Sequence, residues 1–298
     1  MGKRIITSRP LPTWISASLI AGAFGALLWL ERRRPLRQCA VEPKLRHDAR
    51  NLAVAAVSAA ALHLIERPIV ARLTALVERR GWGLLKRRHL PAWLEVALAV
   101  ALLDYTLYLW HVLTHRVPFL WRFHVAHHVD LDMDATTALR FHFAELVVSV
   151  AWRAGQVVII GVSPLSFSVW QTALFLSIMF HHSNVRLPLD VERRLNYFIV
   201  TPRMHGIHHS TIRAETDANW SSGLTVWDLV HGTLRLNVPQ QEIIIGVPAY
   251  REPEEVALSD VLAMPFRSQR PMWRFPDGQS APSERQASRK IPADILLA

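Results

Sequence analysis

Long apolar runs constrain this chain more than any other feature. Residues 13–30 form an 18-residue run without a charged side chain, which is long enough for a helix to cross the hydrocarbon core of a bilayer. Backbone polar groups in lipid must be satisfied internally, so such a run spans as a helix. Further runs lie at 51–65, which continues less cleanly over 68–77, and at 91–110, 146–162 and 163–180. We therefore predict an all-α, multi-pass membrane helical bundle with four to five spanning helices.

The basic residues flank these runs. Lys and Arg number 34 against 24 Asp and Glu, for a net charge of +10, and basic clusters at 32–34 and 86–88 border apolar runs. This placement favours anionic lipid head groups over nucleic acid, and we expect no nucleic-acid partner. The cluster at 32–34 indicates a retained helix that ends in the cytosol. The runs 91–110 and 163–180 would then end there too, although the 86–88 cluster would lie outside, against the positive-inside rule.

Three regions follow from this pattern. Residues 1–94 hold the N-terminal spans and an interfacial loop, and residues 95–235 hold most histidines. Residues 236–298 form a polar C-terminal extension, which we expect to pack loosely or not at all. Its part from 267 to 290, rich in Pro, Ser and Arg, has the composition of a disordered tail.

Histidine is the chemically informative residue, with 15 copies, whereas Cys39 is the only cysteine. A single cysteine excludes an internal disulfide, a Cys-based zinc site and a Cys-ligated iron–sulfur cluster within this chain. His111 and His115 follow the third run at a spacing that places both imidazoles on one helical face. Two such rings can reach one metal ion.

Two HxxHH boxes extend this pattern. They comprise His124, His127 and His128, and then His205, His208 and His209, while His142, His181 and His182 lie between them. The predicted topology brings all of them to one membrane side. Ten or eleven imidazoles exceed the needs of one ion and suit two ions with about five ligands each. Neutral imidazole suits Fe, Zn, Cu and Ni. We interpret the remaining histidines as packed or interfacial, namely His47, His63, His89 and His231.

The order of these boxes resembles the fatty acid hydroxylase/sterol desaturase superfamily. The resemblance covers roughly residues 95–235 and rests on DYTLYLWH at 104–111, LWRFH at 120–124, RFHFAE at 140–145, TPRMHGIHH at 201–209 and NWSSG at 219–223, followed by Trp227 and Asp228. The superfamily comprises integral membrane oxygenases with two non-haem metal ions. Its members hydroxylate or desaturate sterols, fatty acids and related lipids.

The resemblance implies a ligand set, residue by residue. The metal ligands it implies are His111, His115, His124, His127, His128, His142, His182, His205, His208 and His209. His181 occupies a position often filled by Gln, so we expect it beside the ligands and not among them. The implied cofactors are two Fe ions, which Zn can replace in preparations, with O2 as co-substrate and a lipid from the bilayer as substrate. The metal site is expected to face the cytoplasm.

Acidic residues near the boxes have an expected supporting role. Asp104 and Glu145 could each accept a ring N–H from a ligand histidine and fix its orientation. The alternative is a salt bridge to Arg122 or Arg140.

An oxygenase also needs electrons. The chain shows no glycine-rich dinucleotide fingerprint and no iron–sulfur spacing. We therefore expect an external electron donor, which is a reductase, a ferredoxin or a cytochrome.

Three other functions compete with this prediction. A metal-ion transporter would hold its site near the bilayer midplane, whereas these histidines lie at the ends of spans. A zinc-dependent membrane hydrolase would act without O2 or reductant. A haem protein would need two axial histidines and not ten.

Overall fold

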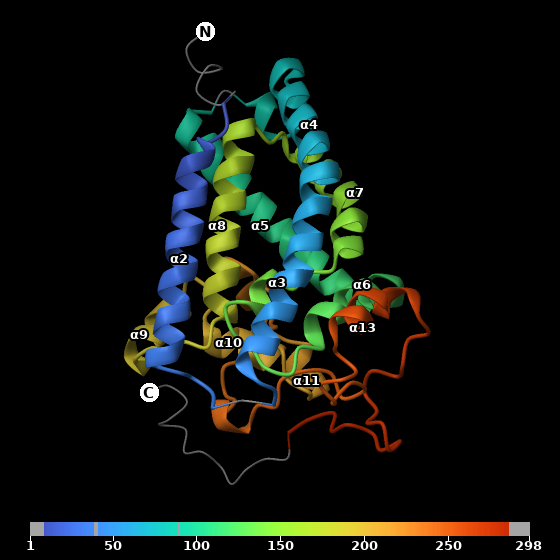
Figure 1. Cartoon of the computed structure of the whole chain (residues 1–298). Coiled ribbons are helices and arrows are strands. Elements are labelled where there is room, and N and C mark those ends of the chain that lie inside the picture. The colour runs from blue at the N-terminus through green and yellow to red at the C-terminus, as the bar shows by residue number, and fades with distance from the viewer. Residues whose placement is uncertain (1–8, 39–40, 89, 286–298) are drawn as a thin grey trace.

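A computed structural model describes residues 9–38, 41–88 and 90–285 (Figure 1). Within these ranges every regular element is a helix, which confirms the predicted all-α class. The long helices are α2 (Thr13–Arg33), α3 (Lys44–Ala61), α4 (Arg67–Arg80), α5 (Ala92–Arg116), α7 (Phe143–Ile160) and α8 (Pro164–His182). The short ones are α6 (Pro118–His128), α9 (Leu189–Leu195), α10 (Pro202–His208), α11 (Arg213–Thr216), α12 (Val226–His231) and α13 (Leu258–Ala263). Single turns are η1 (Leu62–Glu66), η2 (Leu85–Arg87), η3 (Thr137–Leu139), η4 (Gln240–Glu242) and η5 (Met264–Phe266).

Four helices in the described residues are long and apolar enough to cross a membrane. They are α2, the continuous stretch Lys44–Arg87, α5 and α7. Within this stretch the π-helical turn η1 joins α3 to α4, so the helix continues without a break from Lys44 to Arg80. The fifth long helix, α8, has 19 residues and stands among them. This count agrees with the predicted four to five spans, and the chain is an integral membrane protein.

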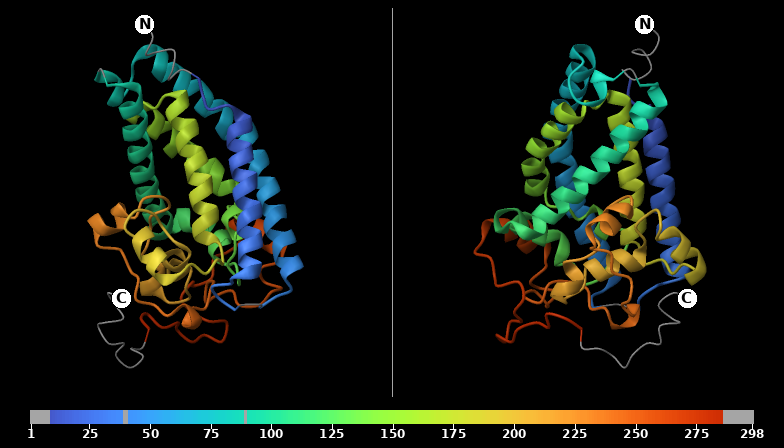
Figure 2. Two further views of the ribbon diagram at one scale, coloured as in Figure 1. Left: turned by 90° about the vertical axis from the view of Figure 1, so that its left-hand side faces the viewer. Right: turned by 180° about the vertical axis from the view of Figure 1, so that it is seen from behind.

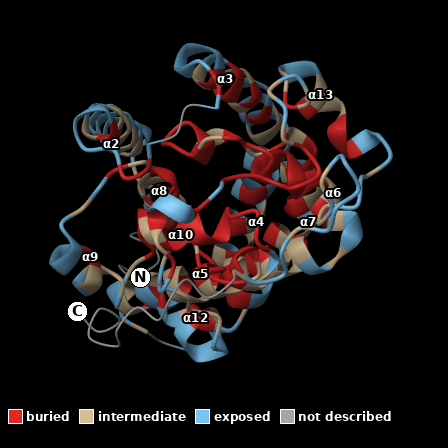
Figure 3. Ribbon diagram, turned by 90° about the horizontal axis from the view of Figure 1, so that it is seen from below, coloured by how far each residue is buried: buried red, intermediate tan, exposed pale blue. Residues whose placement is uncertain are grey.

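The long helices form a bundle, and the short helices gather at one end of it (Figures 1 and 2). α8 packs against α5 and α2, while α7 packs against α4 and α3. Although α7 and α8 are consecutive helices joined by a tight turn, each packs mainly against other helices. α2, α5 and α8 all end where the short helices lie, which is the relative arrangement predicted from the sequence. Seen from that end, buried residues concentrate around α10 and α5, and much of α2 is exposed (Figure 3).

The turn between α7 and α8 is built from residues that stop one helix and start the next. Gly161 ends α7 with a φ of 87°, a conformation that favours glycine. Ser163 then caps α8 by accepting a hydrogen bond from the Ser166 backbone, and Pro164 occupies the first turn. Gly83 lies so close to Gly161 that a side chain there would collide with the backbone. The turn after α4 therefore packs directly against the turn between α7 and α8.

The C-terminal extension packs more closely than the sequence indicated. Val256 and Val261 are fully buried and join Trp121 and Val125 of α6 in one hydrophobic cluster. The expectation of loose packing is wrong for residues 247–264, because their apolar side chains are buried in this cluster with those of α6 and with Val54 of α3. Of the tail expected to be disordered, residues 286–290 lie outside the described residues.

Candidate metal centre

The first two histidine boxes face each other because the chain bends sharply between them. α5 ends and α6 begins at Val117, whose backbone is extended with φ −100° and ψ 112°. Pro118 fits the first turn of α6, where its missing N–H costs nothing. The bend brings α6 back beside α5. The histidines of α6 are thereby set against those near the C-terminal end of α5.

The other histidines come from the end of α8 and from α10. These two helices pack against each other. α10 begins at Pro202, and its seven residues carry His205 and His208, with His209 as its C-cap. His181 and His182 are the last two residues of α8. Segments far apart in sequence therefore meet at one end of the bundle.

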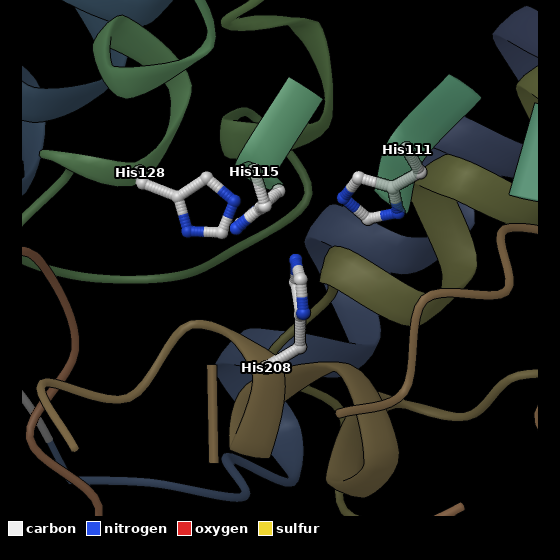
Figure 4. Close-up of side chains that lie close together, drawn as sticks. All are labelled: His111, His115, His128 and His208. Carbon is white, nitrogen blue, oxygen red and sulfur yellow. The ribbon is translucent and has the colours of Figure 1, made fainter. Parts of the chain in front are cut away.

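The structure gathers eight of these side chains into two groups of four. In each group the candidate ligand atoms lie within 4.8 Å of one another. The first group is His111, His115, His128 and His208, and the second is His127, His182, His205 and His209. In the first group the ring of His208 rises from α10 toward the other three (Figure 4).

Backbone carbonyls orient rings of the first group. His111 Nδ1 donates to the Trp220 carbonyl at 2.7 Å, and His208 Nδ1 donates to the Ala218 carbonyl at 2.9 Å. A neutral imidazole that donates from Nδ1 keeps a lone pair on Nε2. The Nε2 atoms of His115, His128 and His208 are buried and have no hydrogen-bond partner. Buried nitrogens of this kind are unfavourable unless something binds them.

His124 lies beside the first group. Its Nδ1 donates to Glu145 Oε1 at 2.9 Å, and its Nε2 is buried without a partner. The centre of its ring lies 4.9 Å from those of both His115 and His128. The prediction that Glu145 orients a histidine is confirmed.

In the second group the Nε2 atoms point at one another. His182 Nε2 lies 3.0 Å from both His127 Nε2 and His205 Nε2, and His205 Nε2 lies 3.1 Å from His209 Nε2. His182 Nδ1 donates to the Ile178 carbonyl at 2.7 Å, so its Nε2 carries a lone pair. Converging nitrogens with too few protons to bridge them are the arrangement expected of ligands around one cation.

His181 lies against this second group. Its ring centre is 4.1 Å from that of His205, and its Nδ1 is buried without a partner. His181 and His182 thus both lie within or against the second group, although consecutive helical residues point about 100° apart. This residue is the one that sequence reasoning placed outside the ligand set.

Burial keeps the cluster neutral. Burial, reinforced by neighbouring imidazoles, holds the pKa values of His127, His128, His205 and His209 well below the usual range. Burial likewise lowers the pKa of His208 to about 3. Neutral imidazole is the form that binds metal. The converging lone pairs, the orphaned nitrogens and the absence of carboxylates from both groups fit a pair of transition-metal ions better than Mg or Ca.

His142 lies apart from both groups, unlike the other nine predicted ligands. Its Nδ1 accepts a hydrogen bond from the Ala144 backbone at 3.1 Å and so caps α7. Its Nε2 donates to the Leu262 carbonyl at 3.1 Å. Both ring nitrogens are therefore used by backbone groups.

Asp104 does not contact a histidine, so its predicted role is wrong. Its Oδ2 accepts from the Leu224 backbone at 2.9 Å and from Trp227 Nε1 at 2.8 Å. Asp104 thus ties the loop before α12 to α5. Its position in the sequence, seven residues before His111, gave no sign of these long-range partners.

A network of buried polar side chains joins α3 to the end of α6, which carries His124, His127 and His128. Asp130, two residues after His128, is fully buried and accepts hydrogen bonds from Asn51 and Arg50 of α3. Arg140, also fully buried, donates from Nε to the Ala126 carbonyl at 2.9 Å and from Nη1 to Asn51 at 2.7 Å. These contacts fix the end of α6 to α3.

An apolar cavity of about 370 Å³ opens beside the histidines. Its walls include His111 of the first group and the neighbouring His124, and they include His127 and His205 of the second group. The remaining walls come mostly from α3, α5, α7 and α8. A cavity of this size suits a small lipid or part of a larger one.

Comparisons with known proteins match the same segment. Residues 96–233 match the family model described as fatty acid hydroxylase. The chain is 32% identical to an ornithine lipid hydroxylase of Rhizobium tropici over 147 residues, which cover 48% of this chain and 42% of the relative. It is 26% identical to the alkylglycerol monooxygenase of Homo sapiens over 155 residues, covering 52% and 33%.

A third relative is the cholesterol 25-hydroxylase of Homo sapiens, which is 27% identical over 173 residues, covering 55% of this chain and 58% of the relative. Each of these matches thus spans less than two thirds of the relative's length. No solved structure matches the chain.

Proposed function

We propose that the chain is a member of the fatty acid hydroxylase family, whose model matches residues 96–233, and that it is an O2-dependent membrane oxidoreductase that hydroxylates or desaturates a lipid-like substrate. The observation that carries the proposal is the position of two buried histidine groups against one apolar cavity. The relatives support a lipid substrate, because their names specify ornithine lipid, alkylglycerol and cholesterol.

The proposed ligands divide into two sets of five. One iron ion would be held by His111, His115, His124, His128 and His208, and the other by His127, His181, His182, His205 and His209. Bound iron would supply the activation of O2 that side chains cannot provide. His142 is left out because both of its ring nitrogens already bind backbone groups.

The protein's own residues would orient the ligands and shape the cavity. Glu145 fixes the ring of His124, and the carbonyls of Trp220 and Ala218 fix the rings of His111 and His208. Outer hydrogen bonds of this kind keep ligand rings in their productive orientation. The apolar walls exclude water from the reacting carbon and present it at the histidine end of the cavity.

The electrons would come from a separate protein. In this proposal the end of the bundle that carries the histidines faces the cytoplasm, with Arg32 and Arg33 of α2 at the same end. A basic rim can steer an acidic reductase, ferredoxin or cytochrome.

Lipid profiling tests the proposal. Cells that express the wild type are compared with cells that express His205→Ala, and His231→Ala serves as the matched control because this exposed histidine lies outside both groups. We expect an oxidised lipid with the wild type and the control, only in the presence of O2. A product that forms without O2 supports the zinc hydrolase instead. Identical profiles under several growth conditions contradict the enzyme.

A further inference from the structure

A second cavity of about 620 Å³ adjoins the apolar cavity beside the histidines, and we call the two together the passage. The second cavity lies between α2, α8 and the stretch from α3 to α4. The two share five lining residues, which are Ala59, Leu62, Glu66, Gln171 and Phe175. The two cavities therefore adjoin at these residues, which include Gln171 and Phe175 of α8.

Apart from the histidines and Glu145, three side chains with a charged or amide group line the inner cavity, and they are Glu66, Arg153 and Gln171. Glu66 and Gln171 line both cavities, and Arg153 lines the inner one. Glu66 is 6% exposed and Arg153 is 9% exposed. Such groups are costly inside a membrane protein and mark functional sites.

These three side chains do not form hydrogen bonds with one another. Arg153 Nε lies 3.9 Å from Glu66 Oε1, which is too long for a hydrogen bond, and it has no hydrogen-bond partner among the described residues. Within the part of the chain that the structure describes, the side chains of Glu66 and Gln171 form no hydrogen bond. Only Arg153 Nη1 is engaged, through Gln156 Oε1 at 2.6 Å, and its guanidinium lies 4.4 Å from the centre of the Trp170 ring.

The backbone is distorted where Glu66 enters the passage. Residues Leu62–Glu66 form the π-helical turn η1 between α3 and α4. Such turns are rare and frequently occur at functional sites. Its two end residues, Leu62 and Glu66, line both cavities, whereas His63 lines only the outer one and Leu64 lines neither.

The polar residues lie far from the histidines along the bundle. Arg153 is eight residues beyond Glu145 on α7, and Gln171 is ten residues before His181 on α8. At 1.5 Å per residue, these separations correspond to about 12 Å and about 15 Å. The passage thus has an oxidising end and a polar end roughly 12–15 Å apart.

We propose that Glu66, Arg153 and Gln171 bind an uncharged polar group, a hydroxyl, at one end of an otherwise apolar lipid whose other end reaches the histidines. The inference rests on the proposed function and narrows its substrate class. A hydroxyl donates to the Glu66 carboxylate and accepts from the Arg153 guanidinium, so one group would satisfy both side chains. The pair is neutral overall, which disfavours a carboxylate or an amine in the same position.

Equilibrium binding tests the proposal without requiring oxidation. The full chain in phosphatidylcholine nanodiscs is titrated with two matched pairs of radiolabelled probes, cetyl alcohol against hexadecane and cholesterol against cholestene, which lacks its hydroxyl. We expect the hydroxylated member of at least one pair to bind about tenfold more tightly. Palmitate, the charged probe, is expected to bind more weakly than cetyl alcohol.

Substitutions test whether these residues cause the preference for the hydroxylated probe over its matched hydrocarbon. Arg153→Met and Glu66→Gln should reduce it to about twofold or less, and the milder Gln171→Leu, which alters no charge, should reduce it in part. Glu95→Gln is the matched control, because this buried carboxylate binds Lys86 and lines neither cavity. Equal binding of both members of each pair, tighter binding of palmitate, or a preference retained in all three variants would overturn the inference. A hydroxyl preference without any oxidised product would instead contradict the proposed function alone.

Discussion

Asp130 is the residue outside the histidine groups whose change we expect to cost most stability. Its Oδ2 accepts hydrogen bonds from His47 at 3.1 Å, Asn51 at 2.9 Å and Thr137 at 2.8 Å. Its Oδ1 accepts one from Arg50 at 3.0 Å. Asp130 itself is fully buried. One carboxylate thus joins the loop after α6 to α3.

The substitution Asp130→Asn removes the charge and keeps the shape. Arg140 Nη1 lies 3.7 Å from Asp130 Oδ1 and is also fully buried, so its charge would lose its counterion. Breaking a buried ion pair costs about 3–5 kcal/mol. Because Arg50 keeps Glu42 as a second partner, we expect the lower end, about 3 kcal/mol.

The pH dependence has a definite sign. Burial alone would raise the pKa of Asp130, but the positive charges of His47 and Arg140 outweigh it and hold the pKa well below the usual range. A depressed carboxyl pKa stabilises the fold above the unfolded value of about 3.9, and this contribution is lost as the pH falls toward the folded value. The difference in stability between wild type and Asp130→Asn should therefore shrink as the pH falls below about 4.

Thermal unfolding in detergent micelles measures the effect. We expect the midpoint of Asp130→Asn to fall by roughly 6 °C or more. Asp132→Asn is the matched control, since this carboxylate lies two residues further on, is only partly buried and accepts a hydrogen bond from the Val41 backbone. Equal midpoints for the two variants, or a change of less than about 1 °C in Asp130→Asn, would refute the reasoning.

Three other predictions concern the metal centre and its surroundings. Glu145→Gln should weaken binding of the first metal ion by about 10–100-fold in chelator competition, because the ring of His124 loses its charged acceptor; unchanged affinity would contradict this role. His142→Ala should lower the free energy of unfolding by about 2 kcal/mol, since it removes a helix cap and a contact to Leu262, yet leave metal content intact; loss of metal would make it a ligand. His181→Ala should lower the affinity for the second ion in the same competition, whereas wild-type affinity would place this residue outside the ligand set.

Much of the fold was readable from the sequence because a bilayer imposes simple rules. An uncharged run of 18 residues can only span as a helix, so the positions of the long helices followed directly. The histidine boxes were equally readable, because spacings of three and four residues place side chains on one helical face. Their convergence at one end of the bundle followed from counting the spans.

What could not be predicted depends on the paths of loops and on distant partners. His142 and His181 lie in different surroundings because the loop before α7 turns the former onto backbone groups, while α8 ends with the latter against His205. Neither outcome leaves a trace in local spacing. Asp104 found its partners beyond residue 220, and the extension after residue 245 packed on α6 without a helical period to announce it.

The number of metal ions per chain tests the central claim most directly. Elemental analysis of the purified chain, expressed with iron, should give two ions per chain for the wild type. His128→Ala and His209→Ala, one from each group of four, should each fall toward one ion, and the double variant toward none. A wild-type content of one ion or fewer after iron loading, or an unchanged content in both single variants, would contradict a paired metal centre.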